Sequence, residues 1–311
     1  MVATRRAVGK RLGWARIPAV VHDWVRATVG PVQVLREHEG GMSPGCAVSL
    51  LASEGRRVFV KAVAMSSNED TVALFRGEIA VLERLPPARY RPNLRAVFDD
   101  GECVALMLDH IDGRYPDLSV AADVRTIAGA LSAQSRELTP APQAVDVPTL
   151  AERTTRWARR WTAMAEAPVR YLPAWAAADF DALYARVDAL PRRLDATTLC
   201  HLDVREDNLL IRPDGSAVIL DWGRPHRGPG WADVALLAGQ VPPGEAERAL
   251  VDWAPEAALD TATDLLLSFA GQAAWWAQQP PPPALPNLPA FCRQDAEHVF
   301  RSLERLIYPS H

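Results

Sequence analysis

The stretch HLDVREDNLL, residues 201–210, decides the fold together with VILDWG, residues 218–223. The first stretch places Asp203 five residues before Asn208, which opens a short apolar run. The second ends another apolar run with a single carboxylate, Asp221. Because the intervening RPDGS has the composition of a tight turn, the two apolar runs are predicted to pair as a β-hairpin. The hairpin would bring Asn208 and Asp221 to the same end, with Asp203 on the incoming loop.

These three side chains have the chemistry of a magnesium and phosphate site. An Asn amide oxygen and a carboxylate suit Mg²⁺, which takes a few protein oxygens and completes its shell with water and phosphate. A further carboxylate that does not bind the metal, here Asp203, can accept a proton from an attacking hydroxyl. The alternative at this point is a surface loop that holds polar residues without any shared chemistry.

Composition and charge narrow the class of protein. The chain has 311 residues, 49% of them hydrophobic and 23% charged, which predicts one large domain or two lobes around a buried core. A net charge of -4 argues against a nucleic-acid partner. The four cysteines are far apart, which argues against a disulfide framework or a zinc site. The longest apolar stretch, residues 265–277, is too short to span a bilayer, so we expect a cytoplasmic protein without a membrane partner.

The local patterns divide the chain into a sheet-rich part and a helical part. Before Gly113 they predict helices at 18–30 and 68–85 and strands at 31–38, 47–53, 56–63, 93–101 and 103–113. After it they predict helices at 119–138, 149–166, 174–190, 231–239, 244–251, 260–278 and 290–307, with short strands near 197–201, 208–211 and 217–221. We therefore expect an α+β fold with a small antiparallel-sheet lobe, residues 1–110, and a larger helical lobe, residues 111–311.

Two charged residues of the first lobe stand out against their neighbours. Lys61 is one of only two lysines in the chain and lies in the predicted strand RRVFVKAVA. Its ammonium could contact phosphate oxygens as a point charge, or extend along the strand face to solvent. Glu78 falls in the middle of the predicted helix 68–85, where it could pair with Lys61 or lie on a solvated face.

A glycine-rich loop follows the first predicted strand. The residues EGGMSPG, 39–45, include three glycines and Ser43. A loop without bulky side chains lets backbone N–H groups approach phosphates. A plain hairpin turn is the alternative.

Taken together, these elements resemble a known family. HLDVREDN followed by LDWG resembles the protein-kinase catalytic loop H-x-D-x-x-x-x-N and the D-F-G segment after it. It is more similar still to the aminoglycoside phosphotransferase and choline kinase-like family, whose loop has roughly the pattern H-G-D-x-x-x-x-N-x-L. The similarity extends over residues 18–305, with its elements in the family's order. It implies a two-lobed protein-kinase-like fold and an O-phosphotransferase that uses ATP or GTP with Mg²⁺.

The resemblance also implies roles in the reaction itself. Asp203 matches the catalytic base, and Asn208 and Asp221 match the magnesium ligands. Lys61 matches the strand lysine that contacts the nucleotide phosphates, and Glu78 matches its partner on the helix.

Further positions match parts of the family that bind the nucleotide or support the loop. Gly41, Ser43 and Gly45 match the loop that covers the phosphates. The backbone groups of Asp109 and Ile111 match the hinge that meets the nucleobase. His201 is expected to shape the catalytic loop, and Asp233 in GPGWADVA to brace it.

The chain departs from the family pattern at two places in the catalytic loop. Leu202 stands where the family usually has glycine, which puts the tightness of the backbone turn in question. Arg205 and the two acids after it stand where His-Pro-Gly is common. Arg205 could approach the transferred phosphate or pair with a neighbouring acid, and we expect the second arrangement, at the surface.

The acceptor is not specified by these motifs. From Arg224 onward the chain has ten acidic residues against six arginines. This excess of acids favours a polycationic aminoglycoside as the acceptor, although an ordinary solvated helical surface would show the same excess. Trp275 and Trp276 could stack on a sugar or hold choline, and at most one of them is expected to face a cleft. We therefore expect transfer to a hydroxyl of an aminoglycoside-like antibiotic or related natural product. A metabolic kinase for choline, a sugar or an amino alcohol, and a nucleotide-binding pseudokinase, are the alternatives; the oligomeric state is unknown.

Overall fold

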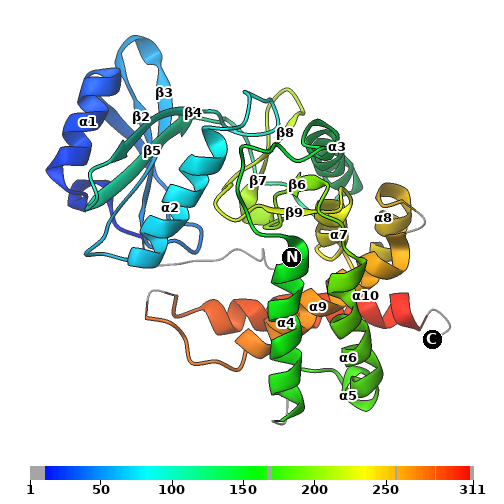
Figure 1. The fold of residues 1–311 in the computed structure, drawn as a ribbon. Coiled ribbons are helices and arrows are strands. Elements are labelled where there is room, and N and C mark those ends of the chain that lie inside the picture. Colours follow the sequence, from blue (N-terminus) through cyan, green and yellow to red (C-terminus); the bar gives the residue numbers. More distant parts are fainter. Residues whose placement is uncertain (1–10, 167–169, 256–257, 284, 309–311) are drawn as a thin grey trace.

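The computed structural model describes residues 11–166, 170–255, 258–283 and 285–308. It has the two-lobed protein-kinase-like architecture that the sequence predicts, with a sheet-rich lobe joined to a larger helical lobe (Figure 1). The elements that position the site follow from local sequence patterns, whereas their assembly depends on two buried hydrophobic clusters.

The first lobe is built on one antiparallel sheet with strand order β1-β2-β3-β5-β4. Its strands are β1 (Gln33–Glu37), β2 (Cys46–Leu51), β3 (Arg57–Ala64), β4 (Leu94–Asp99) and β5 (Cys103–Asp109). Two helices, α1 (Ala19–Val29) and α2 (Glu69–Leu82), cover opposite faces (Figure 1). Because a helix covers each face, the strands are apolar on both faces. Val60 and Met107 pack in the cluster that includes α1. Val63 and Leu106 pack in the cluster that includes α2.

Successive side chains of β3 point to opposite faces of the sheet. Val60 and Ala62 face α1, so Lys61, which lies between them in the sequence, faces α2. Helix α2 begins where Asn68 accepts a hydrogen bond from the backbone N–H of Thr71 at 2.8 Å, as an N-cap residue does. This start sets the helical register that turns Glu78 toward the sheet, where the residue is 1% exposed. Lys61 and Glu78 therefore meet because alternation along β3 and the helical repeat of α2 turn both side chains toward the space between the sheet and the helix.

The helical lobe contains α3 (Ala121–Glu137), α4 (Leu150–Ala165), α5 (Ala174–Ala178), α6 (Phe180–Ala189), α7 (Ala232–Ala238), α8 (Ala246–Trp253), α9 (Leu259–Trp276) and α10 (Leu288–Ile307). Helix α9 runs through its middle and packs against α4 and α10 (Figure 1). Trp161 of α4 is fully buried against it, because Gly271 of α9 leaves room for the indole ring.

Two local predictions for this lobe are wrong in detail. The single helix expected at 174–190 is divided at Asp179, whose backbone angles of φ -104° and ψ 22° end α5 before α6 begins. A short strand, β9 (His226–Gly228), was also missed, and it pairs with β6 (Thr198–Cys200). Three residues are too few for a period-2 pattern to be recognised.

The predicted hairpin is formed by β7 (Leu209–Ile211) and β8 (Ala217–Ile219), which pair antiparallel with Leu209 opposite Ile219. It lies between α3 and the sheet-rich lobe (Figure 1). All four cysteines are buried and unpaired. Within the described ranges, none of the helices combines the length and the apolar character that a membrane span requires.

Candidate active site

A buried ionic triad joins the two lobes. The Lys61 ammonium donates to both carboxylate oxygens of Glu78, at 2.9 and 2.7 Å, and to Oδ1 of Asp221 at 3.2 Å. The backbone N–H of Trp222 donates to Oε1 of Glu78 at 3.3 Å, which ties the end of β8 to α2. Side chains from β3, α2 and the segment after β8 therefore meet at one point, although they are up to 160 positions apart in the chain.

The triad fixes the charge of its members. Burial opposes the charged form of Lys61, but attraction to Asp221 and Glu78 outweighs it and holds the pKa of the lysine above its ordinary value. Burial likewise opposes ionisation of Asp221, but Lys61 and, more weakly, Arg205 lower its pKa to about 2. Lys61 is therefore cationic and Asp221 anionic at neutral pH, the states needed to bind phosphate and a divalent cation.

The catalytic loop is held from beneath by Asp233. Its carboxylate accepts hydrogen bonds from the backbone N–H groups of His201 at 2.8 Å and Leu202 at 2.7 Å, and from the Gln134 amide at 2.8 Å. The His201 ring nitrogen Nε2 lies 2.8 Å from the carbonyl oxygen of Leu220 and 3.0 Å from that of Asp221. Both residues support the loop, in the manner expected from the sequence.

Leu202 makes the turn that glycine usually makes in the family that the sequence resembles. Its φ of 57° lies in the left-handed region, which is unfavourable for a leucine. The side chain is buried in the main cluster, and the backbone N–H is held by Asp233. Packing and this hydrogen bond compensate for the strained conformation, so the departure from the family pattern leaves the turn in place.

Replacing Asp233 with alanine is expected to reduce the free energy of unfolding by about 1–3 kcal/mol, because buried N–H donors lose their acceptor. Asp252, which is exposed on α8, provides the matched control. Asp252→Ala should change the free energy of unfolding by less than about 0.5 kcal/mol. Urea unfolding followed by circular dichroism measures both. Equal stability of the two variants would show that Asp233 does not brace the loop.

Asp203 and Asn208 face each other across this loop. The Asn208 amide nitrogen donates to the backbone oxygen and to Oδ2 of Asp203, both at 2.9 Å. Arg205 lies beside them, with Nε 3.0 Å from Oδ1 of Asp207 and Nη1 3.4 Å from Oδ1 of Asp203. The expectation of a surface pair is wrong for Arg205: it pairs with Asp207, but its side chain is 13% exposed and also approaches the proposed base. The glycine-rich loop above it encloses the guanidinium, whose Nη1 is 3.4 Å from the sulfur of Met42.

The donor set of the predicted magnesium site fits that ion. The backbone N–H of Leu220 donates to the carbonyl oxygen of Asn208 at 2.8 Å, which places Asn208 next to Asp221. Because the Asn208 amide nitrogen is committed to Asp203, the amide oxygen is the atom left for a cation. An amide oxygen and an ionised carboxylate are ligands suited to Mg²⁺ when phosphate and water supply the others. In the described part of the chain, no three His, Cys, Asp or Glu side chains are grouped so that they could hold a metal ion by themselves.

The glycine-rich loop lies between β3 of the first lobe and Arg205 of the predicted catalytic loop. Gly41 has a φ of 100°, and a Cβ at Gly45 would lie 2.9 Å from the carbonyl oxygen of Ala62 and 3.1 Å from the Phe75 ring. Among the described residues, the hydroxyl oxygen of Ser43 is buried without a hydrogen-bond partner. A buried donor of this kind fits a loop that binds phosphate oxygens.

Arg11 is a site residue that the sequence did not reveal. Its Nε donates to the carbonyl oxygen of Gly40 at 2.5 Å and its Nη1 to that of Gly45 at 3.3 Å. Burial lowers its pKa, and attraction to Asp221 is the strongest influence that opposes this. A second cation thus lies under the loop near Asp221, contributed by a segment without any recognisable motif.

We expect Gly45→Ala to weaken nucleotide binding and lower the midpoint of thermal unfolding, because the added methyl group meets backbone in β3. Gly40→Ala is the matched control, since a Cβ there has no neighbour within 4 Å. Isothermal titration with ADP and Mg²⁺ should show a higher Kd for Gly45→Ala alone. Similar values for the two variants would indicate that close approach of this loop is unimportant.

The predicted hinge lies at the end of β5. The backbone N–H of Asp109 donates to the carbonyl oxygen of Asn93 at 3.0 Å, and its side chain accepts from Arg95 at 2.5 Å and from the Asn93 amide at 2.8 Å. The N–H of Asp109 is therefore already engaged, which leaves its carbonyl group and the backbone of Ile111 for the predicted contacts with a nucleobase.

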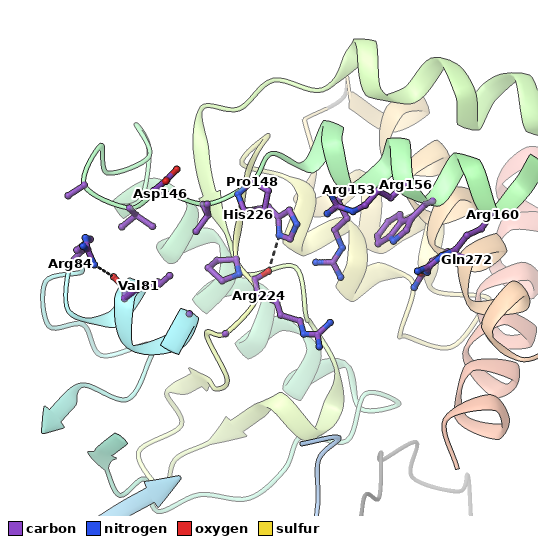
Figure 2. Close-up of a pocket in the computed structure, with 18 of the residues that line it drawn as sticks. Val81, Arg84, Asp146, Pro148, Arg153, Arg156, Arg160, Arg224, His226 and Gln272 are labelled. Atoms are coloured by element: carbon purple, nitrogen blue, oxygen red, sulfur yellow. Dashed lines mark hydrogen bonds between the residues drawn. The ribbon is translucent and has the colours of Figure 1, made fainter. Parts of the chain in front are cut away.

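A cavity of about 620 Å³ opens beside the triad, between α2, α4 and the segment that follows β8 (Figure 2). Gly77 and Gly223, the neighbours of Glu78 and Trp222, form the wall on the side of the triad. Trp276 and Trp157 line the cavity, whereas Trp275 is absent from its lining, so one residue of the tryptophan pair faces it as expected. None of the described acids after Arg224 lines it, so the lining does not form the acidic cleft suggested by that segment.

Solved structures with the same fold include several small-molecule kinases. An aminoglycoside phosphotransferase from Alicyclobacillus acidocaldarius is 16% identical, with a TM-score of 0.56, 91% of this chain covered and 95% of that one. A choline kinase from Streptococcus pneumoniae is 15% identical, with a TM-score of 0.57 and coverage of 93% and 96%. The GDP complex of wild-type aminoglycoside 2'-phosphotransferase-IIIa is 14% identical, with a TM-score of 0.61 and coverage of 94% and 97%. These likenesses show the fold.

The sequence itself matches a family model. No curated protein is significantly similar to the chain. The model described as the phosphotransferase enzyme family matches residues 35–264, which include the end of β1, the ionic triad, the predicted catalytic loop and most of the helical lobe. This match covers well over half of the 311 residues. The chain therefore belongs to the phosphotransferase enzyme family.

Proposed function

We propose that the protein transfers the γ-phosphoryl group of ATP or GTP to a hydroxyl of a small natural product or metabolite. The observation that carries this proposal is the meeting of Lys61, Glu78 and Asp221 within hydrogen-bond distance, next to a loop that offers Asp203 and Asn208. A structural ion pair would explain Lys61 and Glu78 alone. It would not explain a second carboxylate and an amide oxygen at the same point.

Each residue has a distinct part in the proposed reaction. Phosphoryl transfer proceeds through a loose transition state, so the protein contributes mainly position and charge. Lys61, oriented by Glu78, would contact the nucleotide phosphates, and the oxygens of Asn208 and Asp221 would hold Mg²⁺, which offsets phosphate charge when bound. Asp203 would orient the acceptor hydroxyl and accept its proton. The glycine-rich loop, with Gly41, Ser43 and Gly45, would cover the phosphates.

Among acceptors, we propose a hydroxylated natural product of the kind that antibiotic-modifying kinases take, handled in the cytoplasm. The structural relatives include enzymes named for aminoglycosides and for choline, and both classes of compound are small molecules with a free hydroxyl. A metabolic kinase for a sugar or an amino alcohol is the second candidate, because Trp276 offers an aromatic face in the cavity.

A nucleotide-consumption assay tests the proposal directly. ATP and GTP are each offered with aminoglycosides, macrolides, choline, neutral sugars and sugar acids, and the product is confirmed by phosphorus NMR. We expect one acceptor class to give turnover that requires Mg²⁺. Nucleotide binding without turnover on any of them would favour a pseudokinase instead.

A further inference from the structure

The cavity beside the triad is strongly cationic. Among the described lining residues, Asp146 is the one carboxylate. The arginines that line the cavity are five: Arg84, Arg153, Arg156, Arg160 and Arg224. The chain as a whole has a net charge of -4, so this concentration is not a consequence of general basicity. It is a local arrangement that attracts negative charge.

Helix α4 supplies three of these arginines from one face. Arg153, Arg156 and Arg160 are spaced i, i+3 and i+7, the spacing that aligns side chains along a helix. Figure 2 shows all three on the same stretch of α4, with Arg224 on the opposite segment. The guanidinium carbon of Arg160 lies 4.9 and 5.1 Å from the ring centroids of Trp275 and Trp276, which hold it in place.

These arginines lack acidic partners within the described chain. Arg153, Arg156 and Arg224 form no ion pair there, Arg84 donates only to the carbonyl oxygen of Ala80, and Arg160 donates to the Gln272 amide oxygen. By contrast, Arg186 and Arg193 of the same lobe both pair with the buried carboxylate of Asp264. Unmatched guanidinium groups that face one cavity repel each other and are stabilised when a ligand supplies negative charge.

His226 adds a neutral polar group to the same wall. The residue is 6% exposed, and its Nε2 is buried without a hydrogen-bond partner among the described residues. Burial, reinforced by repulsion from Arg153 and Arg156, lowers its pKa to about 4, so the ring is uncharged at neutral pH. One residue of the lining thus keeps a buried ring nitrogen without a partner, close to the unmatched cations.

The cavity is close to the proposed reaction centre. Gly223 in its wall is two residues from Asp221, and Gly77 is next to Glu78. Burial lowers the pKa of Arg153, and attraction to Asp203 opposes this, so Arg153 lies within electrostatic reach of the proposed base. A small molecule in this cavity can therefore extend toward the proposed base.

We propose that the arginine-lined cavity binds an anionic group of the acceptor, so that the substrate is a hydroxylated small molecule bearing a phosphate or a carboxylate. This inference rests on the proposed phosphotransferase function. Guanidinium groups are suited to it, because their planar fork matches the oxygens of either anion. A polycationic aminoglycoside or choline would meet repulsion from the same side chains.

Titration calorimetry with inorganic phosphate tests the inference. A non-hydrolysable ATP analogue and Mg²⁺ are added first at saturation, so that phosphate cannot bind at any of the three phosphate positions of the nucleotide. The wild-type protein is compared with Arg153→Gln/Arg156→Gln and with Arg159→Gln, which changes an exposed arginine of the same helix outside the cavity. We expect a Kd that rises on the order of tenfold or more in the double variant and is unchanged in Arg159→Gln.

The outcomes separate the two proposals. Phosphate binding that survives in the double variant, or that is absent from the wild-type protein, overturns the anionic acceptor whether or not the ATP analogue binds. Failure of the ATP analogue to bind overturns the phosphotransferase, and the same phosphate titration without nucleotide still tests the cavity. The unfolding midpoint of the double variant, measured in parallel, excludes loss of fold as the cause. Succinate titrated in the same way distinguishes a carboxylate from a phosphate as the preferred group.

Discussion

Replacing Asp203 with alanine is expected to lower kcat by on the order of 10²–10⁴-fold, the contribution typical of a general base. The carboxylate is 22% exposed in its side chain and accepts a hydrogen bond from Asn208, so it is accessible to an acceptor hydroxyl and held in one orientation. The variant loses the proton acceptor but none of the residues proposed to bind nucleotide. Turnover is measured with the acceptor found in the nucleotide-consumption assay, and Kd for ADP with Mg²⁺ is measured separately.

Two controls make this result specific. Asp203→Asn keeps the shape of the side chain and an oxygen that can accept from Asn208, and it should lose as much turnover as the alanine variant because an amide is not a base. An unchanged Kd for nucleotide would assign the loss to the chemical step. Turnover near the wild-type value in both variants would remove Asp203 from the role of base.

The second large effect is expected from Lys61→Met. Glu78 is 1% exposed, and without Lys61 it would be a buried carboxylate with its main partner removed. Breaking a buried ion pair from one side costs about 3–5 kcal/mol, and we expect the free energy of unfolding to fall by that amount at neutral pH. The loss should be smaller near pH 5, because the isolated carboxyl group has a raised pKa and can become protonated in the folded state.

The double variant Lys61→Met/Glu78→Gln distinguishes stability from function. Removing both charges should restore most of the free energy of unfolding, since the glutamine can still accept from the backbone N–H of Trp222. It should not restore nucleotide binding, because the ammonium that faces Asp221 is still missing. Recovery of both properties would show that Lys61 is a structural residue only.

Much of the fold could be predicted because it follows from the local spacing of apolar and polar residues in strands and helices. The strand around Lys61 and the N-cap at Asn68 are visible as patterns, and together they place Lys61 and Glu78 on facing surfaces. The hairpin between Asn208 and Asp221 is predictable for the same reason, from a turn sequence between two apolar runs. The family resemblance then supplied the order of the lobes.

The parts that could not be predicted depend on contacts between distant segments. Arg11 belongs to no motif and enters the site only because its segment passes beneath the glycine-rich loop. The cationic cavity needs Arg224 to lie opposite α4, and a count of charges along the helical lobe gave the opposite expectation because it ignores which face each side chain occupies. The prediction that Arg205 lies at the surface was wrong for a similar reason, since the loop that contacts it comes from the other lobe.

The central claim is that one metal-bound nucleotide lies among Lys61, Asn208 and Asp221, with Asp203 beside it. The most direct test is the Kd of a non-hydrolysable ATP analogue, measured by titration calorimetry with Mg²⁺ and with EDTA, for the wild-type protein and for Asp221→Ala. Our account predicts that Mg²⁺ tightens binding to the wild-type protein and has no such effect on Asp221→Ala. An affinity of the wild-type protein that is the same with Mg²⁺ and with EDTA, or a full Mg²⁺ effect in Asp221→Ala, would contradict it.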